Sequence, residues 1–177
     1  MKNTIIPAIT SIKGLEAFLT TPHPIGIVMS IHASMLHRVI ERIHQAGKKA
    51  WVHLDLLPGI SSDEAGAEYV IQSFSVDGIV STKTGAVKIA KKKGVTAIYR
   101  VFLIDSASLT KSLQRIKELS PDYIEFLPAL AQKVIPVIAA QITPPIIGGG
   151  LIQDKQDIQA CFDSGMVAVT VSNPKLW

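Results

Sequence analysis

Short apolar runs rich in β-branched residues alternate with longer amphipathic stretches along the whole chain, and this alternation limits the fold more than any other feature. Strands that recur with a helix between each pair run parallel, because each helix carries the chain back across the sheet. Eight strands are predicted, over Ile5–Ile9, Ile25–Met29, Ala50–Leu54, Gly78–Ser81, Ala97–Leu103, Tyr123–Leu127, Pro145–Gly148 and Val167–Val171. Seven helices are predicted between them, over Ser11–Leu19, Ala33–Gln45, Asp63–Phe74, Thr84–Lys93, Ala107–Leu119, Gln132–Gln141 and Asp154–Ser164.

Eight strands with seven helices predict an α/β fold, a closed TIM-like β/α barrel, with residues 1–177 as one domain. A barrel of this kind typically has about 250 residues, so the chain is short for the fold. Only Ser172 and Asn173 and then Pro174 to Trp177 follow the last predicted strand, and the eighth helix is therefore expected to be missing or reduced to a single turn. An open doubly wound sheet is the alternative.

Composition narrows the class of protein. Hydrophobic residues make up 47% of the chain and charged residues 18%, which suits strands buried on both faces. No apolar run reaches the roughly 20 residues of a membrane span, and no secretory signal is visible. The single cysteine, Cys161, excludes internal disulfides and fits a reducing cytoplasm. No Cys/His cluster has the spacing of metal ligands, so no metal is predicted.

The formal net charge of +4 permits an anionic partner without requiring one. Lysines cluster at Lys48–Lys49 and Lys91–Lys93, each at the end of a predicted helix. Cations there interact favourably with the negative end of the helix dipole. Contact with a nucleic acid is the alternative interpretation of each cluster.

In both candidate folds, ligands bind beyond the carboxyl ends of the strands. Gly148–Gly150 follow the seventh strand, and consecutive glycines allow the backbone to approach a ligand and turn its N–H groups toward it. Ser172 and Asn173 follow the eighth strand and supply further donors. Because many barrels bind phosphate in these two loops, the sequence predicts a phosphate site there.

His53 and Asp55 are two residues apart near the end of the third strand, so they are expected to project to one side. They either bind ligand hydroxyls or act as acid and base, or they form a His–Asp hydrogen bond that closes the core. Lys83, which opens a helix after the fourth strand, is a candidate to neutralise a phosphate or to form a Schiff base.

Arg100 and Glu125 lie inside the otherwise apolar fifth and sixth strands. Because these strands are predicted neighbours, the two side chains are expected to form a buried ion pair. In the alternative, Arg100 binds a ligand phosphate and Glu125 accepts hydrogen bonds from ligand hydroxyls.

An ordered series of segments resembles the glycerol-3-phosphate-responsive antiterminators, and the resemblance covers essentially the whole chain. These segments are Ile6–Ile9 (IPAI), His53–Leu56 (HLDL), Asp77–Lys83 (DGIVSTK), Arg100–Ser106 (RVFLIDS), Pro121–Pro128 (PDYIEFLP), Pro145–Ile152 (PIIGGGLI) and Leu176–Trp177. The chain departs from the family pattern in two small residues. Gly148 stands where the family more often has alanine, and Ala129 stands where it more often has glycine.

The resemblance implies a β/α barrel that binds glycerol-3-phosphate and then the leader of a messenger RNA, and so prevents premature termination of transcription of glycerol genes. It implies no cofactor other than this effector. Barrel geometry, together with that ligand, assigns the phosphate to Gly149, Gly150 and Ser172, with Lys83 or Arg100 nearby. The same reasoning assigns the glycerol hydroxyls to His53, Asp55 and Glu125.

Two other functions remain open at this point. An enzyme acting on a small phosphorylated polyol or sugar, such as an isomerase, aldolase or phosphodiesterase, would use His53, Asp55, Lys83 and Glu125 as acids, bases or nucleophile. A scaffold without a ligand ranks third. A homo-oligomer is also expected, because a missing eighth helix would leave apolar barrel surface uncovered near Trp177.

Overall fold

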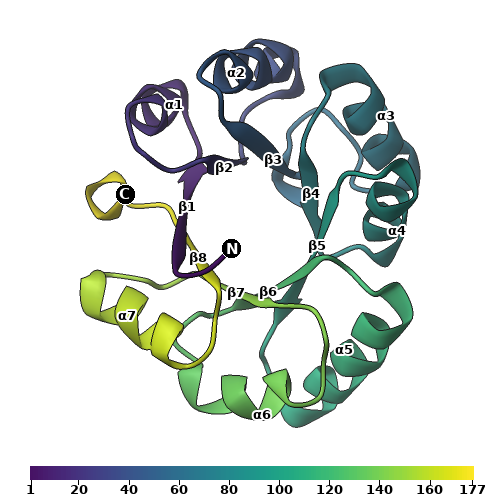
Figure 1. The fold of residues 1–177 in the computed structure, drawn as a ribbon. Coiled ribbons are helices and arrows are strands. Elements are labelled where there is room, and N and C mark those ends of the chain that lie inside the picture. Colours follow the sequence, from purple (N-terminus) through teal and green to yellow (C-terminus); the bar gives the residue numbers. More distant parts are fainter.

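The computed structural model describes residues 1–177 and forms a closed barrel of eight parallel strands, in which each strand pairs with the next and β8 pairs with β1. Helices surround the barrel on the outside (Figure 1). The strands are β1 (Thr4–Ile9), β2 (Ile25–Val28), β3 (Lys49–His53), β4 (Gly78–Ser81), β5 (Thr96–Phe102), β6 (Tyr123–Leu127), β7 (Ile146–Gly149) and β8 (Ala168–Val171). The predicted closed barrel is confirmed, and each strand begins and ends within one residue of its predicted bounds.

Seven α-helices and three short 3-10 turns connect the strands. The helices are α1 (Ile12–Leu19), α2 (Ala33–Gln45), α3 (Glu64–Phe74), α4 (Thr84–Lys93), α5 (Ser106–Leu119), α6 (Ile135–Ala139) and α7 (Lys155–Asp163). The 3-10 turns are η1 (Leu54–Leu56), η2 (Gln132–Val134) and η3 (Pro174–Leu176). Four helices begin where a side-chain oxygen accepts a hydrogen bond from a first-turn N–H group, at Ser11, Asp63, Asp105 and Asp154.

The predicted helix over Gln132–Gln141 is shorter than expected. The structure has the turn η2 followed by five residues of α6. Pro136 lies in the first turn of α6, where its missing N–H group is not needed, and it could not be accommodated further inside a helix. The position of Pro136 therefore explains why the α-helix begins only at Ile135.

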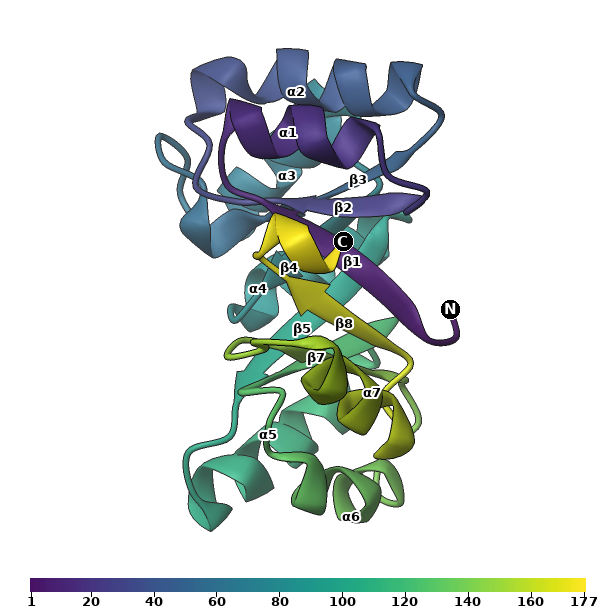
Figure 2. The ribbon, with the colours of Figure 1, turned by 90° about the vertical axis from the view of Figure 1, so that its left-hand side faces the viewer.

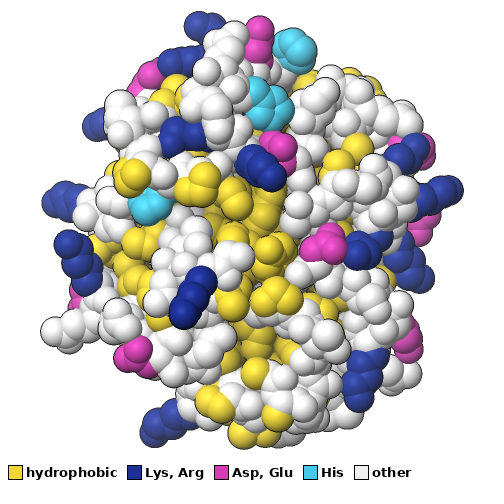
Figure 3. All heavy atoms as spheres, in the orientation of Figure 1, with side chains coloured by type: hydrophobic (Ala, Val, Ile, Leu, Met, Phe, Trp, Pro, Cys, Tyr) yellow, Lys and Arg dark blue, Asp and Glu magenta, His cyan; other side chains and the backbone are white.

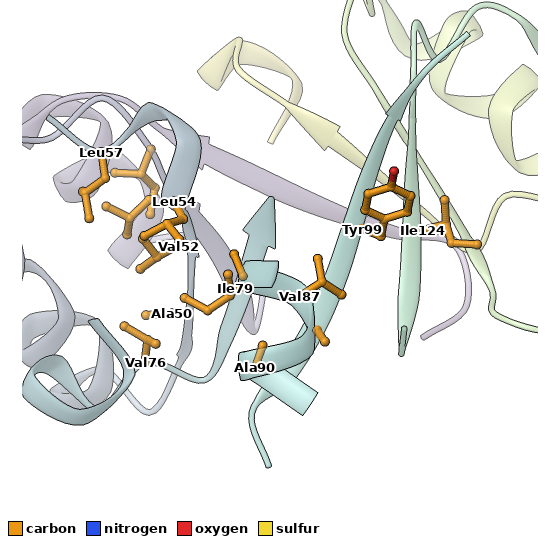
Figure 4. Close-up of a cluster of buried hydrophobic side chains, with 14 of the residues drawn as sticks. Ala50, Val52, Leu54, Leu57, Val76, Ile79, Val87, Ala90, Tyr99 and Ile124 are labelled. Atoms are coloured by element: carbon orange, nitrogen blue, oxygen red, sulfur yellow. The ribbon is translucent and has the colours of Figure 1, made fainter. Parts of the chain in front are cut away.

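Alternation along the strands separates two layers of core. Inward-facing side chains fill the barrel itself, and they are Ile6, Ile27, Trp51, Val80, Ile98, Ile147 and Ala168. Outward-facing side chains, such as Ala50, Val52 and Ile79, pack under the helices, where Val87 and Ala90 of α4 meet them (Figure 4). Strands buried on both faces account for the high apolar content of the sequence.

The two ends of the barrel differ in chemistry. The amino ends of the strands face the viewer in Figure 1, and in the same orientation hydrophobic side chains occupy the middle of this end (Figure 3). Half-buried Ile25, Tyr123 and Val167 pack there against the barrel interior. The carboxyl ends lie to the left in Figure 2, and the polar inward-facing residues Arg100, Glu125 and Thr170 lie nearer to that end, each two residues beyond an apolar one.

The turn η3 stands in place of an eighth helix, as predicted. Leu176 and Trp177 pack against the core, and the Trp177 indole N–H donates to the Val171 carbonyl at 2.8 Å. The apolar surface expected to be open near Trp177 is therefore covered, and this reason for expecting a homo-oligomer is wrong. Oligomerisation itself stays a prediction. No helix of the protein combines the length and hydropathy needed to cross a membrane.

The two lysine clusters behave differently. Lys91 to Lys93 form the last turn of α4, as predicted; Lys91 pairs with Asp122 and Lys93 with Glu68. Lys48 does not close the helix before it. Its ammonium group instead donates to the carbonyls of Thr21 and His23 after α1, at 2.6 and 2.8 Å.

Candidate functional site

A cavity of about 180 Å³ opens at the carboxyl end of the barrel. Residues of β1, β5, β6 and β8, the residue just after β2, and residues of the β7–α7 and β8–η3 segments surround it. They are Ala8, Met29, Arg100, Leu127, Gly150, Leu151, Ile152, Thr170, Val171 and Ser172. Of the predicted ligand-binding residues, Arg100, Gly150 and Ser172 line this cavity.

The β7–α7 loop turns its backbone in an unusual way. Gly150 has φ +77° and Leu151 has φ +62°, so two successive residues take the left-handed conformation, which glycine adopts without strain. The N–H groups of Gly150, Leu151 and Ile152 have no acceptor within the protein, and neither do those of Ser172 and Asn173 in the neighbouring segment. Unpaired amide groups from turning backbone form the kind of concave surface that binds anions.

The side-chain oxygen of Asn173 is used within the protein. This oxygen accepts a hydrogen bond from the Lys175 N–H at 3.1 Å and so caps η3. This contact holds the segment after β8 in place, and it leaves both the side-chain NH2 group and the backbone N–H of Asn173 available as donors to a ligand.

Arg100 and Glu125 form the predicted buried ion pair. Arg100 Nε donates to Glu125 Oε2 at 2.6 Å, and the two residues are opposite one another on β5 and β6. The other carboxylate oxygen, Oε1, accepts from the Thr170 hydroxyl at 2.6 Å. The two terminal nitrogens of the Arg100 guanidinium have no protein partner, and Arg100 lines the cavity. The ion pair with Glu125 is therefore confirmed, and the guanidinium still has two nitrogens that make no bond within the protein.

Gly149 makes room for this network. A Cβ atom at this position would lie 2.7 Å from both Glu125 Oε1 and Thr170 Oγ1. Gly149 therefore acts through close packing inside the barrel, and Gly150 through its backbone conformation. Thr170 was missed by sequence reasoning. Its place two residues after inward-facing Ala168, and two before Ser172, is the signal that could have identified it.

His53 lies in the barrel wall with 2% of its surface exposed. Neither ring nitrogen has a hydrogen-bond partner, so the expected His–Asp hydrogen bond is absent. Burial, reinforced by the positive charge of Arg100, lowers the pKa of His53 to about 4, although the charges of Glu125 and Asp55 oppose this shift. The imidazole is therefore neutral at pH 7.

The sequence predicted that Asp55 and His53 project to the same side, and this prediction is wrong. The strand β3 ends at His53, and the 3-10 turn η1 interrupts the alternation of side chains that the prediction relied on. One Asp55 oxygen accepts from the Ser81 hydroxyl, and the other accepts from the Thr82 N–H at 2.7 Å. Asp55 thus fixes the turn between β4 and α4, and both of its oxygens are already engaged.

Lys83 is separated from the predicted phosphate loops. It is exposed, which removes the burial that a Schiff-base lysine requires, and it borders a different cavity of about 570 Å³. This second cavity lies between the starts of α3 and α4, with Arg115 of α5 at its side. Asp63 and Glu64 also line it, so it carries both signs of charge. The structure brings Arg100, not Lys83, to the cavity formed by Gly150 and Ser172.

The two departures from the family pattern adjoin in space. A Cβ atom on Gly148 would lie 3.2 Å from the Ala129 methyl group and would also meet the sulfur of Met166. Glycine at 148 therefore leaves space for alanine at 129, and the reverse arrangement would place a similar volume at the same point.

The β6–α6 and β7–α7 loops are linked directly. The Ala129 N–H donates to the Gly149 carbonyl at 2.7 Å. The buried thiol of Cys161 on α7 donates to the Ala129 carbonyl at 3.6 Å, and burial raises the pKa of this thiol. The β7–α7 loop, which borders the cavity, is thus joined through the β6–α6 loop to α7.

The fold and the site define the class of protein: an eight-stranded β/α barrel whose carboxyl end offers unpaired backbone amides and a guanidinium with free donors, the chemistry that recognises an anion. The chain belongs to the glycerol-3-phosphate responsive antiterminator family, whose model matches residues 5–177.

The chain is also similar to two solved structures and to one curated relative. The glycerol uptake operon antiterminator regulatory protein from Listeria monocytogenes is 32% identical, with a TM-score of 0.94, over 98% of this chain and 94% of that one. An antiterminator-related protein from Thermotoga maritima shares the fold at 24% identity and a TM-score of 0.87, over 100% and 99% of the two chains. "Uncharacterized protein YgcP" of Escherichia coli (strain K12) is 30% identical over 99% of this chain and 92% of its own length.

Proposed function

We propose that this protein is a transcription antiterminator that binds glycerol-3-phosphate at the carboxyl end of its barrel and then binds the leader of a messenger RNA in the cytoplasm. The family supports the effector and the regulatory role. The ligand phosphate would accept hydrogen bonds from the N–H groups of Gly150, Leu151, Ser172 and Asn173. Its charge would be met by Arg100.

The observation that carries this proposal is the coincidence of free donors in one small cavity. Arg100 keeps two guanidinium nitrogens unpaired beside the left-handed turn at Gly150. The cavity volume of about 180 Å³ is below the range of roughly 300–1,000 Å³ typical of pockets for drug-sized ligands, and so suits a ligand with few heavy atoms. A three-carbon phosphate ester meets both conditions.

The chemistry of the titratable groups favours a regulator over an enzyme. Both oxygens of Asp55 and both oxygens of Glu125 are held by protein donors. His53 is neutral with a pKa of about 4, far from the near-neutral pKa that suits a general base. Lys83 is exposed and lies outside the cavity. None of these groups is therefore placed and poised to move protons at neutral pH.

The ligand half of the proposal is tested by thermal unfolding with glycerol-3-phosphate, free glycerol or inorganic phosphate. Glycerol-3-phosphate is expected to raise the midpoint most, because a ligand that binds only the folded state stabilises it. Ser172→Asp places a carboxylate beside the free amides and is expected to abolish this rise. Ser106→Asp adds the same charge at the exposed start of α5 and serves as the control. An equal rise in both variants would contradict the assigned phosphate position.

The RNA half is tested by a fluorescence titration of the labelled leader RNA with and without glycerol-3-phosphate, at several salt concentrations. Binding is expected only with the effector, and it is expected to weaken as salt rises because cations on the protein displace counterions from RNA. Leader binding that is independent of the effector, or absent at moderate salt, would overturn this half.

A further inference from the structure

His53 is the one side chain whose two nitrogens, both buried, lack hydrogen-bond partners in the interior of the barrel. Its place there follows from the alternation along β3: Trp51 faces inward, so His53, two residues on, does too. The other polar side chains that face inward at this level, Arg100, Glu125 and Thr170, are bonded to one another.

A buried imidazole without partners destabilises the folded protein, because it gives up its hydrogen bonds to water and gains none in return. His53 therefore does not serve the fold through hydrogen bonding, and an apolar side chain of similar size would fill the same space. Being neutral, the ring offers one N–H donor and one lone pair. A hydroxyl group, which both donates and accepts, complements either nitrogen.

The remaining residues expected to bind ligand hydroxyls already have partners. The Asp55 oxygens accept from Ser81 and Thr82, and the Glu125 oxygens accept from Arg100 and Thr170. Among the three predicted hydroxyl-binding side chains, only His53 keeps its full hydrogen-bonding capacity for a ligand.

Met29, just after β2, is the cavity-lining side chain that neighbours His53 of β3. The register of β2 on β3 pairs Val28 with Val52, so Met29 follows next to His53. Met29 lines the cavity and is only half-buried, and its unbranched side chain changes rotamer readily. Met29 is therefore the side chain that must move for a ligand in the cavity beside Arg100 to reach the His53 imidazole.

We propose that His53 is the specificity-determining residue of this site: it binds a hydroxyl on the ligand's carbon chain and so selects hydroxylated phosphate esters over alkyl phosphates. The inference rests on the proposed function, because it takes the phosphate as bound at the Gly150 loop. It adds that the protein distinguishes ligands by their carbon chain and that it does so through one imidazole.

The test compares the affinities of two esters of equal chain length, glycerol-3-phosphate and n-propyl phosphate, by calorimetric titration. The wild-type protein is expected to bind the hydroxylated ester at least about tenfold more tightly, since the alkyl ester leaves the buried imidazole unpaired. In His53→Leu the ratio of the two affinities is expected to fall to within about twofold, because the hydrogen bond that distinguishes the two esters is lost. His37→Leu, at an exposed histidine of α2, should keep the wild-type ratio.

The unfolding temperature gives a second readout, and its expected change is one that a purely structural role of His53 would not cause. His53→Leu is expected to unfold at a higher temperature than the wild type without ligand, because it removes an unpaired polar group. An imidazole ¹⁵N NMR spectrum of the wild type, which needs no variant, should show the His53 resonances shifting with glycerol-3-phosphate but not with n-propyl phosphate.

Four outcomes overturn the inference, and the first three leave the proposed function standing. Equal wild-type affinity for the two esters, or an unchanged ratio in His53→Leu, removes the role of His53 while leaving the phosphate site standing. Unshifted His53 resonances at saturating glycerol-3-phosphate do the same. Failure of both esters to bind the wild type would refute the proposed function and the inference together.

Discussion

Replacing Glu125 by glutamine tests the electrostatics of the barrel interior. Glu125 is fully buried, and its carboxylate lies 2.6 Å from Arg100 Nε and 2.6 Å from the Thr170 hydroxyl. Glutamine has nearly the same shape, so the substitution removes the charge and little volume. The Arg100 cation, itself only 8% exposed, then remains without a counterion.

Breaking a buried ion pair from one side destabilises a protein by about 3–5 kcal/mol, chiefly through the charge left unpaired. For a domain of this length, 1 kcal/mol shifts the unfolding midpoint by roughly 2–4 °C, so Glu125→Gln is expected to lower it by about 6–20 °C. Urea unfolding followed by circular dichroism gives the free energy directly. Glu16→Gln, which breaks the exposed pair with Arg42, is the matched control and is expected to change little.

Inorganic phosphate adds a second arm to this experiment. The free nitrogens of Arg100 face the cavity, so a bound anion would replace the missing counterion. Phosphate is therefore expected to raise the midpoint of Glu125→Gln more than that of the wild type. A loss below about 1 kcal/mol would refute the reasoning about the buried pair. A variant that gains no more from phosphate than the wild type would refute the assignment of Arg100 to the anion.

Three further substitutions or titrations test other parts of the site. Gly149→Ala is expected to destabilise the protein by about 1–3 kcal/mol in urea unfolding, because its methyl group overlaps Glu125 and Thr170; an unchanged midpoint would contradict this packing. Asp55→Ala frees the turn before α4 and should lower stability by about 1–3 kcal/mol, with faster hydrogen exchange at the Thr82 amide as the local sign. The folded state holds the pKa of His53 near 4, below its ordinary value of 6.5, so the unfolded chain binds a proton more readily. Stability should therefore fall as pH drops from about 6.5 toward 4, by on the order of 3 kcal/mol from this group, and a pH series of unfolding midpoints in which His53→Leu declines as steeply as the wild type would disprove it.

The fold could be predicted because its signals are local and repeated. Alternation of side chains within strands, turn residues between elements and capping residues such as Asp154 are all short-range properties of the sequence. The pairing of Arg100 with Glu125 also followed, because charged residues inside two neighbouring apolar strands have few other partners.

The predictions about the site that were wrong depended on where the local sequence pattern stops. Asp55 was assigned to the face of His53 because the alternation was extended past the end of β3, whereas η1 redirects the chain one residue earlier. Lys83 was grouped with the phosphate loops because it follows a strand, but exposed side chains at the rim diverge from the barrel axis and border different cavities. Whether Gly150 and Ser172 contact a ligand depends on their free N–H groups, which no residue pattern reports.

The contact between Cys161 and the Ala129 carbonyl has a kinetic consequence. The chain has one thiol, which is fully buried where α7 meets the β6–α6 loop, and that loop is hydrogen-bonded to Gly149 beside the turn that borders the cavity. A thiol reagent can therefore react only when this edge of the barrel opens, and the rate of labelling counts those openings against time. If the bound effector suppresses opening of this edge, the rate of labelling should fall in proportion to the occupancy of the site. The native thiol of Cys161 would then report the motions of the site without an engineered cysteine.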